Sequence, residues 1–292
     1  MIDREAFKKH LPGVVGAAVL VLAVIETAAA LLAPWRTPTE THWKAASAAI
    51  RSQFRAGDLI VAAPSWSDPV MRFHLGDLMN LEMVARLDAA VYGRVWELSQ
   101  RGARAPEAQG NLALDQSYGP LHLRRWDRPA AQPLYNFVKQ WREARVLRQS
   151  ESASVECPLQ ADRHQCPNIG FNWVKPAVME MDFGLRQALY AQPVGAAEVV
   201  LEYKDVPLGN TLAVAGGLHH TWLRKGGQGT VSLAIHVGGT RVGQLVIGNR
   251  SRWKPLYIDT RAFAGQRQIV RFSITSNEPF SRHFGFAAEA RQ

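Results

Sequence analysis

Aromatic, cationic and amide side chains gather in the C-terminal third of the sequence, close to glycine-rich turns. They are Trp222, Trp253, Tyr257, His219, Arg224, Asn249 and Arg252. Indole and phenol rings present flat apolar faces to the C–H groups of a sugar, and polar groups bond to its hydroxyls. The combination predicts a glycan-binding site in loops or at strand ends. The alternative is that Trp253 and Tyr257 fill the core of this region.

Groups suited to catalysis form weaker patterns. The Ser65–Asp68 segment follows an expected buried strand, but it lacks the GxSxG motif and suits turn or capping positions. Glu180 and Asp182 stand two residues apart, which would place both carboxylates on one face of a strand, as a hydrolytic pair requires. Arg186 lies nearby and indicates an ordinary ion-pair cluster instead. We therefore predict no catalytic residue.

The histidines offer a metal-binding alternative. His219, His220, His236 and His283 would hold a metal only if they converged on one face of a sheet. Neighbouring residues of a strand point to opposite faces, so at most one of His219 and His220 serves a given face. We predict structural or surface histidines and no metal. Nucleotide-binding glycine loops are absent from the sequence as well, so we expect no cofactor.

The two cysteines, Cys157 and Cys166, are close in sequence. The apolar segment near the N-terminus, described next, predicts that the chain is exported. An even pair of cysteines at this spacing in an exported chain predicts a local disulfide that closes a loop. A metal site that recruits His164 is the alternative, but the sequence has no CxxC motif and no fourth ligand at a typical spacing.

Residues 11–35, LPGVVGAAVLVLAVIETAAALLAPW, are mostly apolar. Roughly 20 apolar residues in a helix cross a hydrocarbon core. The cationic residues in 1–10 favour a cytoplasmic tail, because lysine and arginine near a span stay inside. We expect a signal anchor in the inner (cytoplasmic) membrane, single-pass, with the bulk of the chain periplasmic. A cleaved signal peptide is the alternative, since small residues at 28–30 resemble a cleavage site.

Two residues of this span have separate interpretations. Trp35 stands at its outer end, where an interfacial aromatic belongs. Glu26 is costly inside a membrane, and it either reaches the outer interface or contacts a partner helix.

The net charge of +9 would raise nucleic acid as a partner in a cytosolic protein. Export argues against it, and the arginines are scattered rather than gathered in one stripe. A basic exterior near an anionic membrane accounts for the charge, with a glycan or anionic lipid as possible ligands and no nucleic acid.

The secondary-structure pattern divides the exported part and predicts an α+β protein. Strand, helix and strand alternate in residues 40–150, which predicts a small α/β domain, with residues 134–147 as a helix or an extended arm. A disulfide-closed connector is expected over 151–176. From 177 to 292, short β-branched and aromatic segments alternate with glycine turns, which predicts an antiparallel β-sandwich. The expected strands are 198–203, 211–215, 230–237, 241–247, 254–258, 268–275 and 282–290.

The order of expected strands and turns in residues 177–292 resembles that of jelly-roll sandwiches of the carbohydrate-binding-module and galactose-binding-like type. The resemblance is best in the "W…IDT…AG…V.F.I" run of residues 253–274. Short motifs in the first half, Gly57–Val61 and Arg94–Trp96 with Trp43, are similar to extracytoplasmic regions found with GT-C type membrane glycosyltransferases. Such transferases have many spans, so that resemblance implies at most an accessory role here.

These observations predict a membrane-anchored extracytoplasmic protein without catalytic activity. It would bind a glycan or lipid-linked sugar, or serve as the partner of a membrane-embedded glycosyltransferase or another envelope protein. A periplasmic hydrolase acting on glycans and a purely structural envelope subunit are the alternatives.

Overall fold

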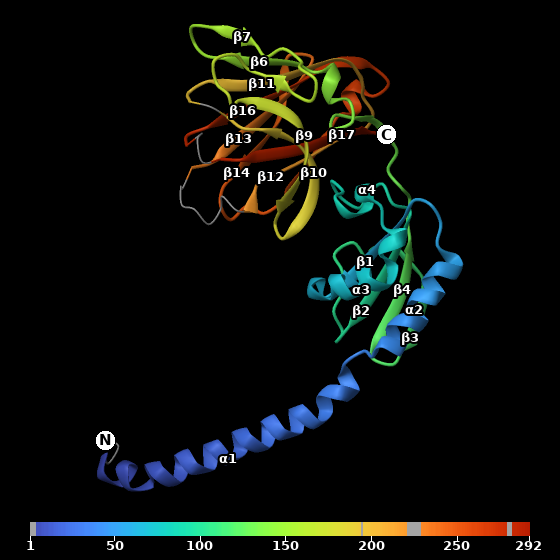
Figure 1. The fold of residues 1–292 in the computed structure, drawn as a ribbon, viewed down its shortest axis with the longest axis vertical. Helices are drawn as coiled ribbons and strands as arrows, with labels where there is room; N and C mark the ends of the chain where they lie inside the picture. The colour runs from blue at the N-terminus through green and yellow to red at the C-terminus, as the bar shows by residue number, and fades with distance from the viewer. Residues whose placement is uncertain (1–3, 194, 221–228, 279–281) are drawn as a thin grey trace. The chain divides into compact units, whose positions relative to one another are not determined.

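The computed structural model describes residues 4–193, 195–220, 229–278 and 282–292, with backbone only for residues 4–12 and 34–35. The chain forms two compact units. The first comprises residues 1–78 and 94–128, and the second comprises residues 79–93 and 129–292. Strands dominate the described part of the chain (Figure 1).

The first unit begins with helix α1 (Arg4–Arg36), and its segment Gly13–Ala33 is apolar and long enough to cross a membrane. A signal sequence near an N-terminus has the same composition, so α1 is either an anchor or such a sequence. Glu26 lies within it with its side chain exposed. Trp35 belongs to the same helix, but its side chain lies outside the described ones.

The rest of the first unit is a small sheet with helices on it. Helix α2 (Glu40–Gln53) buries Trp43, Ala46 and Ile50 at spacings of three and four, as its sequence predicts. The remaining elements are β1 (Asp58–Ala63), η1 (Ser65–Ser67), α3 (Asp68–Leu75), η2 (Gly76–Leu78), β2 (Arg94–Gln100), β3 (Asn111–Tyr118) and β4 (Leu121–Asp127). Strand order is β1-β2-β4-β3, with β1 parallel to β2 and the other pairs antiparallel.

Buried charges hold this sheet together. Asp58, 3% exposed at its side chain, accepts a hydrogen bond from the indole nitrogen of Trp96 at 2.8 Å. Glu97 is fully buried and accepts from the backbone of Ala105 at 2.7 Å and from Arg104 at 3.1 Å. A buried carboxylate persists only when it is paired in this way.

The second unit contains two antiparallel sheets around one core. One sheet has the order β15-β12-β17-β10-β9-β8, with β5 also paired to β17; the other has the order β14-β13-β16-β11-β6-β7. Side chains from both sheets form the main apolar cluster, in which Phe137, Tyr203 and Phe272 meet edge to face at 4.9 and 5.0 Å, and a smaller cluster lies on β9 and β10. This arrangement is a two-sheet β-sandwich.

Its strands match the expectations from residue 198 onward. These are β11 (Glu198–Pro207), β12 (Thr211–Leu218), β13 (Val231–Val237), β14 (Thr240–Ile247), β15 (Lys254–Asp259), β16 (Arg267–Ser276) and β17 (Phe284–Arg291). Strands β13 and β14 form a hairpin around Gly238 and Gly239, and both glycines have positive φ. The earlier elements are α4 (Leu81–Val84), β5 (Pro133–Asn136), η3 (Trp141–Glu143), β6 (Arg145–Gln149), β7 (Ser154–Glu156), β8 (His164–Gln165), β9 (Trp173–Met181) and β10 (Gly184–Ala191), with η4 (Arg261–Phe263) between β15 and β16.

The unit boundaries differ from the predicted ranges. Residues 134–147 are not one helix or arm: β5 pairs with β17 and β6 with β11, so the sandwich begins at Pro129. The connector is part of the sheets, because β7 pairs with β6 and β8 with β9. Its disulfide, Cys157–Cys166, is formed and buried. Residues 79–93 also belong to the second unit, since their contacts are made there.

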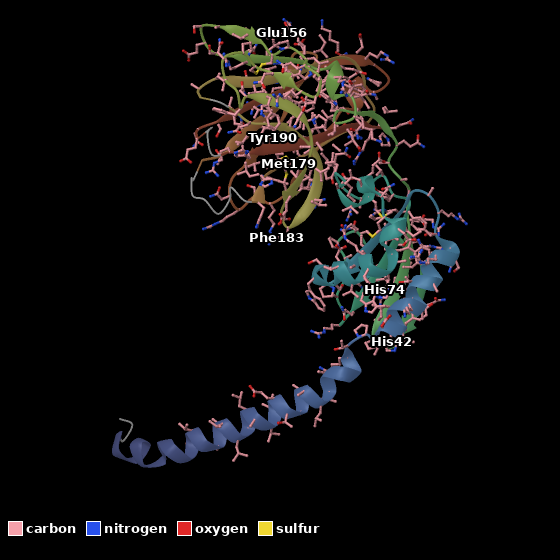
Figure 2. The ribbon with its side chains drawn as sticks, viewed as in Figure 1. His42, His74, Glu156, Met179, Phe183 and Tyr190 are labelled. Atoms are coloured by element: carbon pink, nitrogen blue, oxygen red, sulfur yellow. A yellow bond between two sulfur atoms is a disulfide. The ribbon has the colours of Figure 1, made fainter. Side chains whose placement is uncertain are left out.

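The turn between β9 and β10 corrects a second expectation. Strand β9 ends at Met181, and Asp182 and Phe183 have φ of 53° and 58°. Asp182 therefore leaves the strand and does not share a face with Glu180. Figure 2 shows Phe183 at the tip of this hairpin, whereas Met179 and Tyr190 lie along its strands.

Candidate functional site

The predicted ligand-binding residues separate into two places. His219, Asn249 and Arg252 lie at one end of the sandwich, which we call the loop end and define by residues 182–183, 219–220, 249–252, 277–278 and 282–283. The backbone of His219 donates to the carbonyl of His283 at 2.9 Å, and Asn249 accepts from Arg282 at 2.5 Å. Arg252 is paired with Asp182 at 3.5 Å. Trp222 and Arg224 lie outside the described residues.

Trp253 and Tyr257 instead bind the segment 79–93. The indole nitrogen of Trp253 donates to the carbonyl of Leu87 at 2.9 Å, and the hydroxyl of Tyr257 donates to Asp88 at 3.0 Å. Trp253 is half-buried against the core, as the alternative interpretation has it, whereas Tyr257 is 55% exposed and does not fill the core. Burial and the negative charge of Asp88 raise the pKa of Tyr257 to about 12, so its hydroxyl stays a donor.

The groups considered above for metal binding do not form a metal site among the described residues. His164 is buried between the carbonyls of Cys157 and Trp141, at 3.3 and 3.2 Å, and burial lowers its pKa. Among the residues that the structure describes, no three histidine, cysteine or carboxylate side chains are placed to hold a metal ion.

A pocket opens where the first sheet of the sandwich splits. Strand β17 pairs with β10 at Gly285 and Phe286 and with β5 from Glu289 onward, so Ala287 and Ala288 lie between the two partners. Strand β10 contacts the segment 79–93, where the backbone N–H of Gln187 donates to the carbonyl of Ala85 at 2.8 Å. The resulting cavity is about 350 Å³, the lower end of the range for small-ligand sites.

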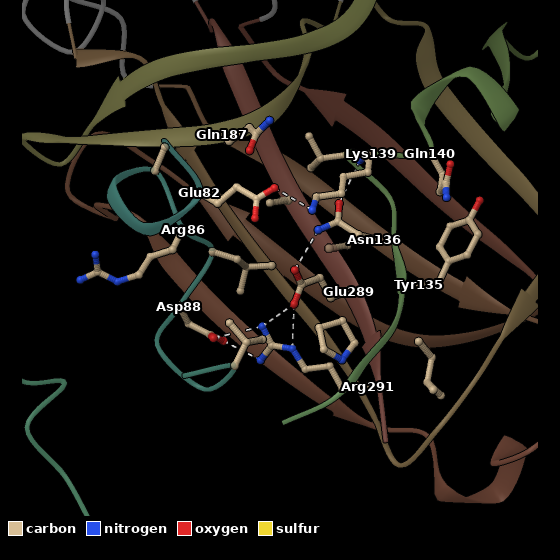
Figure 3. A pocket seen from close by; sticks show the side chains of 18 of the residues that line it. Glu82, Arg86, Asp88, Tyr135, Asn136, Lys139, Gln140, Gln187, Glu289 and Arg291 are labelled. Atoms are coloured by element: carbon tan, nitrogen blue, oxygen red, sulfur yellow. Dashed lines mark hydrogen bonds and ion pairs between the residues drawn. The ribbon is translucent and has the colours of Figure 1, made fainter. Parts of the chain in front are cut away.

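Three stretches of chain form this pocket (Figure 3). The segment 82–92 is one wall, residues 133–140 are the other, and Ala287–Glu289 with Arg291 and Gln187 form the floor. The aromatic ring of Tyr135 lines the second wall, and its hydroxyl donates to Glu143 at 2.6 Å. None of the five predicted residues that the structure describes lines the cavity, although Trp253 and Tyr257 hold its first wall in place.

Hydrogen bonds connect the floor to both walls. Arg291, 4% exposed, forms a two-pronged pair with Asp88 at 2.8 and 3.0 Å and a second pair with Glu289 at 2.7 Å. Glu289 also accepts from Asn136 of the second wall at 2.8 Å. Lys139 and Glu82 bridge the two walls at 2.7 Å, with both side chains more than half exposed. The floor is therefore fixed, while the bridge is an exposed ion pair of small energy.

The electrostatics of the pocket are balanced. Its described lining carries three carboxylates and three cations, which are Glu82, Asp88, Glu289, Arg86, Lys139 and Arg291. Burial acts to raise the pKa of Asp88, but the hydrogen bonds and charge of Arg291, with smaller contributions from the Ala90 amide and Tyr257, outweigh it and hold that pKa below its usual range. A pocket with both signs of charge in equal number suits a neutral ligand rich in hydrogen-bonding groups.

Local sequence patterns carry little sign of this pocket. Its walls and floor come from residues 82–92, 133–140, 187 and 287–291, which are brought together only by the split of the sheet. Asp88 and Arg291 are more than 200 residues apart in sequence and pair directly. The one local feature that could have pointed to it is the pair of charged residues Glu289 and Arg291 near the end of the chain.

Comparisons with known proteins find similar structures but no family. No protein family model matches the chain, and no curated protein matches it. Similar solved structures are carbohydrate-binding modules with a β-sandwich fold. One holds the CBM51-2 and INT domains of Clostridium perfringens ZmpB, at 13% identity and a TM-score of 0.33, over 55% of this chain and 40% of that chain.

Two further structures are of the same kind. CBM51 of a Clostridium perfringens GH95 protein, in complex with methyl-galactose, matches at 10% identity and a TM-score of 0.28, over 62% of this chain and 94% of that one. The module CBM36, in complex with calcium and xylotriose, matches at 18% identity and a TM-score of 0.21, over 39% of this chain and 83% of that one. This chain thus spans less than half of the ZmpB structure, and at such TM-scores the likeness carries no argument about the ligand.

Proposed function

We propose that the chain is a membrane-anchored glycan-binding protein whose jelly-roll-like second unit holds a neutral sugar in the pocket on β17. The observation that supports this most is the composition of that pocket. Carboxylate, amide and guanidinium groups surround a cavity of about 350 Å³ with no excess of either charge among the described lining residues. Sugars are neutral and bond through many hydroxyls, so bidentate polar side chains recognise them.

The fixed floor suits recognition. Arg291 holds Asp88 and Glu289 in place, so little side-chain entropy remains to be lost when a ligand binds. Displacing the exposed Lys139–Glu82 bridge costs little, and it would free an ammonium and a carboxylate for sugar hydroxyls. Tyr135 supplies the aromatic wall that such sites use.

Hydrolysis is the weaker proposal for the same pocket. Glycoside hydrolysis needs one carboxyl group that is protonated near neutral pH. Asp88 has a lowered pKa, and Glu289 and Glu82 are each bonded to a cation. The pocket supports binding better than acid catalysis.

The location outside the cytoplasm is part of the proposal. The formed disulfide Cys157–Cys166 agrees with an oxidising compartment, and the cations Lys8 and Lys9 precede the apolar span. We place the N-terminus in the cytoplasm and the two units in the periplasm. Protection of the units from protease in intact cells, and their cleavage after the outer membrane is opened, would test this.

A membrane glycosyltransferase remains the partner that we propose, with another envelope protein as the alternative. The sequence resemblance at Gly57–Val61 and Arg94–Trp96 is the support for it. Photo-crosslinking from Glu26 in the span would test whether α1 contacts a partner helix. A crosslinked multi-span transferase supports the accessory role, and crosslinks to lipid alone contradict it.

The binding site is tested with two matched variants of the full chain. Asn136→Ala removes an amide from the pocket, and Asn249→Ala removes an amide from the loop end, where the sequence predicts the site. The protein is held in a detergent without a sugar headgroup, screened on a glycan array, and titrated with the glycan that binds. We expect Asn136→Ala to weaken binding about five- to tenfold, from one lost hydrogen bond, and Asn249→Ala to leave it unchanged.

The opposite result assigns the ligand to the loop end and overturns the pocket as the site. If no neutral glycan binds the unmodified chain, the proposed function itself is wrong. Melting curves of both variants show whether either substitution acts through folding.

A further inference from the structure

A stripe of apolar side chains on α3 faces solvent. Trp66, Val70 and Phe73 follow one another at spacings of four and three residues, which places them on one side of η1 and α3. Their exposed fractions are 58%, 43% and 82%. We call these three residues the outer stripe.

The opposite side of the same helix is already buried. Ser67, Met71 and Leu75 are each at most 1% exposed, so they pack into the first unit. A surface helix ordinarily has one apolar face and one polar face. Apolar residues on both sides indicate that the outer stripe has a second apolar environment.

The outer stripe begins at the end of the first unit where the chain enters from α1, and it continues along α3 toward Arg51 in the last turn of α2, which donates to the carbonyl of His74 at 2.7 Å. Only residues 37–39 separate α1 from α2, a reach of at most about 11 Å. His74 stacks on Trp43 in the first turn of α2, with ring centres 6.1 Å apart, and Phe73 meets His74 edge to face at 5.2 Å. Figure 2 labels His42 beside the end of α1 and His74 farther from it in the same unit.

The sheet register places the neighbouring turns at the same end. Ala63 at the end of β1 pairs with Ser99, and Gln100 pairs with Leu121 at the start of β4. The turn before β4 also lies here, because Gly119 is in contact with the ring of His42 in α2. The end of β1, from which the outer stripe continues, is thus the end nearest to the span.

Cations border the outer stripe. The guanidinium of Arg101 lies over the ring of Trp66, 5.5 Å from its centre. Arg101 and Arg36, the last residue of α1, line one hollow together with Ala33 and Pro120. Tryptophan beside arginine is the combination found at the interface of an anionic bilayer, where the ring enters the headgroup layer and the cation bonds to phosphate.

We propose that the outer stripe is a membrane-contact surface, with Trp66, Val70 and Phe73 in the headgroup layer of the bilayer that holds α1 and Arg101 on its lipid phosphates. This inference depends on the proposed anchoring by α1, but not on glycan binding. Through this contact, the first unit fixes its own orientation on the membrane surface.

The test uses the full chain in vesicles and a fluorophore on a single new cysteine. Phe73→Cys places the label on the outer stripe, and Gln109→Cys is the control, an exposed residue beside Gly110, which contacts the far end of β4 at Asp127. The native cysteines are paired with each other and do not react under oxidising conditions. Each chain, carrying an environment-sensitive NBD group, is reconstituted in phosphatidylcholine vesicles with and without phosphatidylglycerol, and lipids with a spin label near the headgroup act as quenchers.

We expect the label at position 73 to show blue-shifted emission and to be quenched at least about threefold more than the label at 109, most strongly with anionic lipid. Adding Arg101→Gln should reduce the difference between anionic and neutral vesicles. Equal quenching at 73 and 109, in chains that float with the vesicles, overturns the membrane contact and leaves the anchor intact. Chains that fail to float overturn the anchor, and the contact with it.

Discussion

The pair of Arg291 with Asp88 allows a quantitative test of what holds the pocket together. Replacing Arg291 by methionine keeps most of the apolar stem but removes the guanidinium that binds Asp88 and Glu289. The side chains of all three residues are at most 12% exposed. The substitution therefore leaves two carboxylates, close together and largely buried, without their shared cation.

The expected cost follows from that burial. Removing one partner of a buried ion pair lowers the free energy of unfolding by about 3–5 kcal/mol, because the remaining charge is desolvated and unpaired. The small exposure of Asp88 and Glu289 favours the lower end, about 3 kcal/mol. The matched control is Arg261→Met, which breaks an exposed pair with Asp259 in the same unit and should change stability little.

The free energy of unfolding should depend on pH differently in the unmodified chain and in Arg291→Met. In the unmodified chain the folded-state pKa of Asp88 is lowered, so its stabilisation is fully present above its usual pKa of 3.8 and is lost as the pH falls through the lowered value. In Arg291→Met, burial without the cation raises the pKa of Asp88 instead. The variant should then gain stability relative to the unmodified chain as the pH falls from 7 toward 4.

The assay is urea unfolding of the full chain in detergent at several pH values, with hydrogen exchange of the β17 amides to assign the transition to the second unit. Equal stability of Arg291→Met and the unmodified chain at pH 7 would refute the buried network. So would a loss in the variant that stays constant from pH 7 to pH 4, because it would show that the substitution acts through packing rather than charge.

Three further outcomes are expected from single positions. Trp253→Phe keeps an aromatic ring but removes the indole donor to Leu87, so it should cost about 1 kcal/mol and speed hydrogen exchange in residues 79–93; unchanged exchange there would show that the bond does not hold this wall. Opening the Cys157–Cys166 disulfide by a double serine substitution should lower stability by about 2–3 kcal/mol for so short a loop, measured as a shift in the urea midpoint, and no shift would contradict a stabilising role. Glu97→Leu should leave its donors unpaired and lower the stability of the first unit by about 3 kcal/mol while glycan binding persists; loss of binding in folded protein would contradict the assignment of the site to the second unit.

Local signals in the sequence were sufficient for several elements. Alternation of apolar and polar residues with glycine turns predicted each strand from β11 to β17, because that period decides which face meets the core. The Cys157–Cys166 pairing was predicted from spacing and is formed. The spacing of Trp43, Ala46 and Ile50 by three and four residues is that of one helix face, and this face is the buried one in α2.

Local sequence patterns do not predict which distant strands pair with each other. Strands β5 and β6 were expected as a helix or an arm. Such short strands have weak periodicity, and they take their conformation from their partners β17 and β11. Asp182 was placed on a strand, whereas two residues with positive φ make it part of a tight hairpin.

The sequence alone determined what depends on neighbours along the chain: the apolar span, the strand pattern of the sandwich and the disulfide. The tertiary structure decided where Trp253 and Tyr257 point, which is toward Leu87 and Asp88. It also created the pocket, because a cavity at the split of a sheet is formed by segments that approach only on folding. Periodicity reports which side of an element is buried, and it carries no information on which distant element covers that side.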